Sequence, residues 1–88
     1  MVNLEIAKLF YEIADILELK NVEWKPRAYR KAAQVLESLS KDVKEIYEDR
    51  GRRGLLEIPS IGEALADKII EYLETKKIKE YEKLKDSL

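Results

Sequence analysis

The sequence contains no cysteine and no histidine. It can therefore form neither a disulfide framework nor a thiolate metal site, and it lacks the most common transition-metal ligand and general base. Zinc chemistry and Ser-His-Asp catalysis are excluded. No segment approaches the roughly 20 apolar residues that a membrane-spanning helix needs, and no apolar stretch follows a basic start as in a secretion signal. We therefore expect a cytoplasmic protein with no membrane partner.

The 88 residues suffice for one domain with a modest core, so we treat 1–88 as a single unit. The chain has 17 Lys and Arg and 18 Asp and Glu, so its net charge is −1. This balance argues against a strongly basic nucleic-acid binder. The distribution of the cations therefore matters more than their sum. Charged residues make up 40% of the chain, and the scarcity of Asn, Gln and Met beside them is typical of proteins from thermophiles.

Apolar residues recur at helical spacing and predict an all-α protein, a compact bundle of four to five short helices. We expect the first helix from Leu4 to Leu19, capped by Asn3 and ended by Asn21. The second begins near Pro26, because proline suits a first helical turn, and runs to about Leu39. The predicted core positions of these two helices are Ile6, Leu9, Phe10, Ile13, Leu17, Tyr29, Ala32, Ala33 and Leu36.

The second half of the chain predicts shorter helices. Ser40 is expected to cap a third helix, which Gly51 closes with a positive φ angle, and a basic loop then covers residues 50–54. A fourth helix is expected from Glu63 to about Glu74, and a last helix follows residues 76–77. The apolar residues of these helices are Val43, Ile46, Tyr47, Leu65, Ala66, Ile69, Leu73, Ile78, Tyr81 and Leu84.

The stretch IPSIGEALADKI, residues 58–69, has the pattern of a helix-hairpin-helix motif, which we place at about 55–69. Pro59 cannot continue a helix but can open a turn, and Gly62 frees the backbone at its end. Such a turn exposes backbone N–H groups at a helix N-terminus, where a DNA phosphate can bind without any reading of bases. The same pattern also fits an ordinary packing corner between two helices.

Three segments in this order and spacing resemble the N-terminal helix-hairpin-helix domain of family X DNA polymerases, the polymerase β-like group in its archaeal and bacterial form. They are residues 13–17 (IADIL), residues 28–33 (AYRKAA) and IGEALADKI with YLET behind it. The resemblance covers essentially the whole chain. It implies a domain of a DNA repair polymerase that binds gapped or nicked duplex at the 5′-phosphate side in base excision repair. We expect a monomer, because no exposed heptad pattern suggests a helical dimer. The polymerase activity itself would need a sheet that this helical chain does not supply.

In some members of that group a lysine removes 5′-deoxyribose phosphate through a Schiff base, and the matching residue here is Lys68. A boundary lysine that extends to solvent is the other interpretation of this position. Tyr29 matches a pocket residue of the family but also suits the core. The resemblance and the basic residues together give the candidate DNA contacts Lys25, Tyr29, Arg30, Arg52, Arg53, Ser60, Ile61 and Gly62.

The resemblance further implies a monovalent cation, Na⁺ or K⁺, held by backbone carbonyl groups of the hairpin. By alignment these groups belong to Leu56, Ile58 and Ile61. No other cofactor is required.

Departures from the family pattern bear on these roles. Ser60 replaces the usual glycine and restricts positive φ. Glu63 and Ala64 stand where a phosphate-binding lysine is typical, and Glu80 stands where a pocket lysine can occur. Three hypotheses stay open: a DNA-binding domain, the same domain with lyase activity, and a helical protein-interaction module that has kept the fold without DNA binding.

Overall fold

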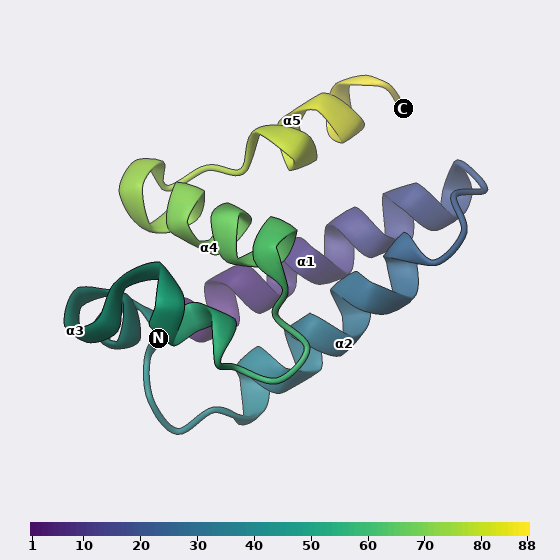
Figure 1. The fold of residues 1–88 in the computed structure, drawn as a ribbon. Coiled ribbons are helices and arrows are strands. Elements are labelled where there is room, and N and C mark those ends of the chain that lie inside the picture. Colours follow the sequence, from purple (N-terminus) through teal and green to yellow (C-terminus); the bar gives the residue numbers. More distant parts are fainter.

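The computed structural model describes all 88 residues and contains only helices (Figure 1). The five helices are α1 (Val2–Leu19), α2 (Lys25–Ser38), α3 (Val43–Leu56), α4 (Glu63–Thr75) and α5 (Lys79–Asp86). The predicted all-α bundle is therefore confirmed.

Helix α1 lies along α2, and the two run in opposite directions (Figure 1). Helix α3 packs against α4, and the final helix α5 returns along α1. One apolar core joins these elements, and its largest fully buried side chains include Phe10, Ile13, Leu36 and Ile69. The predicted apolar stripes are confirmed, because their residues are either buried in this core or packed against it.

The end of α1 follows its sequence signal. Asn21 adopts a left-handed conformation with φ of 61°, and its N–H group bonds the Glu18 carbonyl oxygen at 3.0 Å. The N–H group of Val22 bonds the Leu17 carbonyl oxygen, also at 3.0 Å. These two bonds form a Schellman motif, in which asparagine takes the position that glycine occupies most often.

The predicted cap at the start of α1 is wrong. The helix begins at Val2, and Asn3 lies inside it with no exposed surface. The Asn3 side chain instead joins α1 to the start of α3: Val43 N–H donates to Asn3 Oδ1 at 2.7 Å, and Asn3 Nδ2 donates to the Lys41 carbonyl oxygen at 2.9 Å. A buried asparagine is stable there because both its polar atoms are bonded.

The predicted cap of α3 is also wrong. Asp42, not Ser40, is the N-cap, and its carboxylate accepts a bond from Lys44 N–H at 2.8 Å. The same carboxylate accepts a bond from Val2 N–H at 3.2 Å. Asp42 therefore serves two helix N-termini at once, where a negative charge is favourable.

Residues 50–54 form a kink between two helical segments and not a loop. Gly51 takes the predicted positive φ, 65° with ψ of −156°, inside the span assigned to α3. The chain after it is helical to Leu56, so Arg52 and Arg53 lie on a short helix. Gly54 in this segment is buried, and a Cβ atom there would lie 2.7 Å from Arg50 Cβ. The kink thus creates the first helix of the hairpin.

No helix of the structure has the length and apolarity needed to cross a membrane.

Candidate nucleic-acid interface

The hairpin turn between α3 and α4 is anchored in the core by its two isoleucines and exposes the two residues between them. The side chains of Ile58 and Ile61 are buried in the core, and Ile61 N–H donates to the Ile58 carbonyl oxygen at 3.1 Å. Pro59 and Ser60 between them are exposed. Ser60 has φ of 68°, so the turn has the features of type II, with proline second and a left-handed residue third. Serine accepts there the conformation for which glycine is the usual choice.

The first turn of α4 presents free backbone donors to solvent. No side chain caps this helix, and the N–H groups of Gly62, Glu63 and Ala64 have no hydrogen-bond partner in the protein. All three residues are exposed. Unpaired N–H groups at a helix start carry partial positive charge and favour an anion.

Gly62 has no conformational or packing reason to be glycine. Its φ of −90° and ψ of −172° are extended backbone that any residue adopts, and a Cβ atom there would have no atom within 4 Å. The missing side chain therefore leaves space only for a group outside the protein. Together with the free donors, this space forms a site that suits an oxyanion such as a phosphate.

Two of the three carbonyl groups expected to face a cation are free. The Leu56 and Ile61 oxygens accept no hydrogen bond, whereas the Ile58 oxygen accepts the bond from Ile61 N–H. Carbonyl oxygens are hard ligands, so their chemistry fits a small monovalent cation. No group of three or more Asp or Glu side chains is arranged to hold a metal ion elsewhere.

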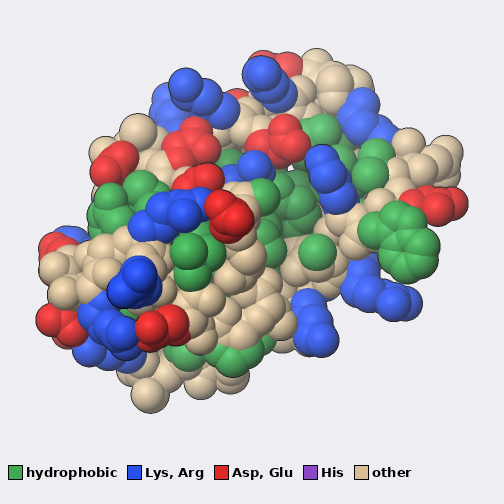
Figure 2. Space-filling view, in the orientation of Figure 1, with side chains coloured by type: hydrophobic (Ala, Val, Ile, Leu, Met, Phe, Trp, Pro, Cys, Tyr) green, Lys and Arg blue, Asp and Glu red, His purple; other side chains and the backbone are tan.

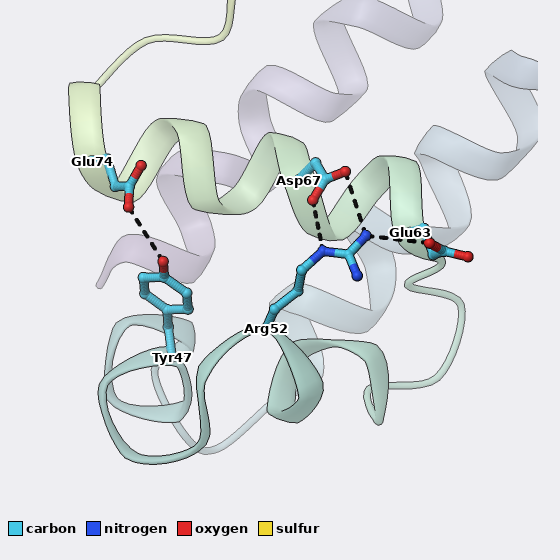
Figure 3. A network of polar contacts seen from close by, with 5 residues as sticks. All are labelled: Tyr47, Arg52, Glu63, Asp67 and Glu74. Carbon is cyan, nitrogen blue, oxygen red and sulfur yellow. Dashed lines mark hydrogen bonds and ion pairs between the residues drawn. The ribbon is translucent and has the colours of Figure 1, made fainter.

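Arg52 joins the two helices of the hairpin by ion pairs (Figure 3). Its Nε lies 2.8 Å from Asp67 Oδ1, and its Nη2 lies 3.5 Å from Glu63 Oε1. The hydrogen bond from Arg52 lowers the pKa of Asp67, and the positive charges of Arg52 and Lys68 act in the same direction. This arginine, expected to contact DNA, is thus occupied within the protein.

Two further arginines are paired in the same way. Arg30 lies 2.9 Å from Asp15 and 3.1 Å from Glu18, both on α1. Arg50 donates to Glu57 at 2.9 Å. Only Arg53 and Lys25 of the predicted basic contacts remain without an ion pair.

Helix α2, which packs along α1, carries three exposed cations that no carboxylate pairs. Lys25, Arg27 and Lys31 are exposed and form no ion pair; we call them the α2 cations. Arg27 and Lys31 line one shallow depression with Arg30 and Gln34. In Figure 2, blue and red side chains alternate over α3 and α4, whereas the end where α1 meets α2 shows blue side chains with few red ones.

Lys68 is partly buried and forms no ion pair or hydrogen bond. It lines none of the surface depressions. Tyr29, its predicted neighbour in a pocket, is 6% exposed and packs edge-on against Phe10 with ring centroids 5.3 Å apart. Burial raises the pKa of the Tyr29 hydroxyl far above its usual range, and the negative charge of Glu80 raises it further. Tyr29 is thus a core residue, and Glu80 brings negative charge toward it.

Trp24 is a candidate contact that the sequence reasoning missed. Its side chain is 78% exposed, and it lines a depression with Glu23 and Arg27. Its backbone has φ of 71° and ψ of −48°, and Lys25 N–H bonds the Glu23 carbonyl oxygen at 2.8 Å, which makes a strained γ-turn. Such strain gathers at functional sites. The signal in the sequence was a single tryptophan in a charged stretch outside every apolar stripe.

A comparison with known families gives one relationship. The model of the helix-hairpin-helix domain family matches residues 1–78, which include the turn and all of α4. A comparison with curated proteins gives no match. Helix-hairpin-helix domains bind DNA, so the match indicates DNA binding without specifying a polymerase. Since the match covers most of the chain, this protein belongs to the helix-hairpin-helix domain family.

Proposed function

We propose that this chain binds gapped or nicked duplex DNA at the 5′-phosphate side, without reading base sequence, as the N-terminal domain of a family X DNA repair polymerase. One observation carries the proposal: the first turn of α4 presents unpaired N–H groups beside Gly62, whose missing side chain serves no purpose within the fold. A phosphate needs both the donors and the space.

The groups of the site select phosphate and not a base. Backbone N–H groups and cations contact DNA phosphates and carry no sequence information. A terminal 5′-phosphate has nearly two negative charges near neutral pH, whereas an internal phosphodiester has one. A site that binds through charge and N–H donors therefore favours a 5′-phosphate end. The carbonyl oxygens of Leu56, Ile58 and Ile61 would hold a Na⁺ or K⁺ ion that adds positive charge beside that phosphate.

The α2 cations and Arg53 supply the remaining attraction. They are exposed basic side chains of α2 and of the hairpin that form no ion pair. Their contacts with phosphates make the affinity fall as salt rises. A protein-interaction module would not show that dependence, so salt separates this proposal from its main alternative.

The test is fluorescence anisotropy with three labelled duplexes: a gap with a 5′-phosphate, the same gap with a 5′-hydroxyl, and an intact duplex. We expect the tightest binding to the first, with affinity that decreases steeply between about 0.05 and 0.2 M salt. Equal binding to all three would reject the preference for a 5′-phosphate end. Absence of binding by folded protein would reject DNA binding and favour the interaction module.

Gly62→Leu tests the site itself. Since a Cβ atom at position 62 would have no atom within 4 Å, the variant is expected to fold normally. Its longer side chain would occupy the space beside the N–H groups, so we expect a loss of about tenfold or more in DNA affinity. Ser87→Leu adds the same bulk at the exposed end of α5 and is the control. Equal affinities of the two variants would show that the phosphate binds elsewhere.

A lyase activity is the second proposal, and it rests on Lys68, which is partly buried and not held by a carboxylate. Its neutral amine would attack the C1′ aldehyde of the 5′-deoxyribose phosphate, and loss of water would give an imine. Removal of a C2′ proton would then break the C3′–O3′ bond and release the downstream 5′-phosphate. Borohydride trapping on an incised abasic site, with Lys68→Ala alongside, tests it: no adduct from protein that binds the same DNA would reject the activity.

A further inference from the structure

Arg52, Glu63 and Asp67 form one group of charges at the entrance of the hairpin, which we call the Arg52 cluster (Figure 3). Arg52 comes from the first helix of the hairpin, and both carboxylates come from the second. Glu63 is the first residue of α4, so the cluster lies beside the free N–H groups that suit a phosphate. Its geometry therefore places a bound phosphate next to two carboxylates and one arginine.

The cluster can open without loss of the fold. The Arg52, Glu63 and Asp67 side chains are 40%, 83% and 62% exposed, and ion pairs in that setting contribute little net stability. Two other contacts hold α3 to α4. The Tyr47 hydroxyl donates to Glu74 at 3.2 Å near the far end of α4, and Leu55 and Ile69 are fully buried in the common core.

Arg52 meets the carboxylates as it would meet a phosphate. Its Nε and Nη2 atoms approach the two oxygens of Asp67, at 2.8 and 3.4 Å. A guanidinium binds two oxygens of a phosphate in the same parallel manner. With carboxylates in place, the arginine is neutralised and Glu63 repels an incoming phosphate. The cluster thus weakens the hairpin site in two ways.

We propose that Glu63 and Asp67 act as an internal phosphate mimic that holds Arg52, and that DNA binding transfers Arg52 from these carboxylates to a DNA phosphate. This inference rests on the proposed DNA-binding function. In this proposal the two carboxylates lower the affinity for DNA, and Arg52 contacts a phosphate only in the complex.

The experiment removes Arg52 both from the wild-type protein and from a variant that lacks the two carboxylates. Affinity for the gapped 5′-phosphate duplex is measured against salt for wild type, Glu63→Gln/Asp67→Asn, Arg52→Ala, and the triple variant. Glu82→Gln/Asp86→Asn removes the same two charges from the exposed side of α5 and is the control. Melting temperatures of all variants confirm that each is folded.

We expect Glu63→Gln/Asp67→Asn to bind about tenfold tighter than the control, because Arg52 then reaches the DNA phosphate without first leaving two carboxylates. Arg52→Ala is expected to change affinity less than about threefold alone, but to remove most of the gain in the carboxylate-free background. Equal effects of Arg52→Ala in both backgrounds would overturn the inference and assign Arg52 a purely structural role.

The two levels of proposal fail differently. If wild type binds gapped DNA and the carboxylate variant tightens no more than the control, the internal mimic is wrong and the DNA-binding function stands. If none of the folded variants binds DNA at low salt, both proposals are wrong.

Discussion

The hairpin and helix α2 differ in how their charges are used. In the hairpin, Arg50 and Arg52 are paired with carboxylates, and the site offers backbone N–H groups and space. Helix α2 differs: it has three unpaired cations and an exposed tryptophan just before it, but fewer free donors at its start, because Pro26 has no N–H group and Lys25 N–H bonds the Glu23 carbonyl oxygen. Under the proposed function, position and attraction would therefore come from different regions: the hairpin would fix a phosphate, and α2 would attract the DNA.

Removal of the α2 cations is expected to have the largest effect on DNA affinity. For Lys25→Ala/Arg27→Ala/Lys31→Ala we expect a loss on the order of 100-fold in affinity at about 0.1 M salt, with a salt slope smaller by up to about 3, or 0.9 for each phosphate contact. Anisotropy titrations at several salt concentrations measure both quantities.

The control for that variant is Lys79→Ala/Lys83→Ala/Lys85→Ala, which removes three exposed cations from α5. Its loss is expected to stay within a few-fold, because Glu80, Glu82 and Asp86 on the same short helix offset the charges of these lysines. Similar losses in both variants would mean that overall charge and not the α2 surface determines binding.

Asn3→Ala tests how strongly α1, which packs along α2, is joined to the start of α3. Asn3 bonds the backbone at both Lys41 and Val43, so its loss leaves a buried N–H group and a carbonyl oxygen unpaired. We expect a decrease in the free energy of unfolding of about 2 kcal/mol, since each unpaired buried group costs roughly 1–3 kcal/mol. Urea unfolding measures it.

The exposed Ser87→Ala is the stability control, with an expected change within about 0.5 kcal/mol. An Asn3→Ala protein as stable as wild type would show that apolar packing and the bond from Val2 N–H to Asp42 suffice to join α3 to α1.

Trp24→Ala separates stacking from charge on the α2 side. The exposed indole adds no core packing, so stability should stay within about 0.5 kcal/mol of wild type. Stacking of an unpaired base on an aromatic ring contributes about 1–3 kcal/mol, so affinity for gapped DNA is expected to fall about tenfold while the salt slope stays unchanged. Trp24→Phe should retain most of the affinity.

Fluorescence provides an independent measurement, because Trp24 is the sole tryptophan of the chain. Its emission should change when gapped DNA is added and should not change with intact duplex. An indole that does not respond to gapped DNA would remove Trp24 from the interface.

The helices could be predicted because their apolar stripes depend only on spacing along the chain. The stripe of α1 through Ile6, Phe10 and Ile13 needs one buried side and nothing more. The family resemblance and the hairpin pattern likewise depend on short motifs, and the family match bears out the helix-hairpin-helix part. The polymerase context remains a prediction.

The role of Asn3 and the ion pairs between helices could not be predicted, because they join residues far apart in the sequence. Asn3 looked like a local cap, yet its partner lies 40 residues away at Val43. Arg52 looked like a free DNA contact, yet Asp67 faces it only because the turn brings α4 back along α3. A charge count along the chain cannot show which cations the fold neutralises.

Ser60→Gly is expected to have the smallest effect, and it tests the conformation of the hairpin turn. Ser60 has φ of 68°, a conformation that costs an L-residue roughly 1–2 kcal/mol and glycine almost nothing. Glycine loses more backbone entropy on folding, so we expect a net stabilisation of about 0.5 kcal/mol by urea unfolding. DNA affinity should change less than about twofold, since the donors at Gly62, Glu63 and Ala64 keep their positions.

Ser60→Ala, which keeps the strain and removes only the hydroxyl, should match wild type in stability. A Ser60→Gly protein with much tighter DNA binding would instead mean that the strained turn itself limits how closely the phosphate approaches.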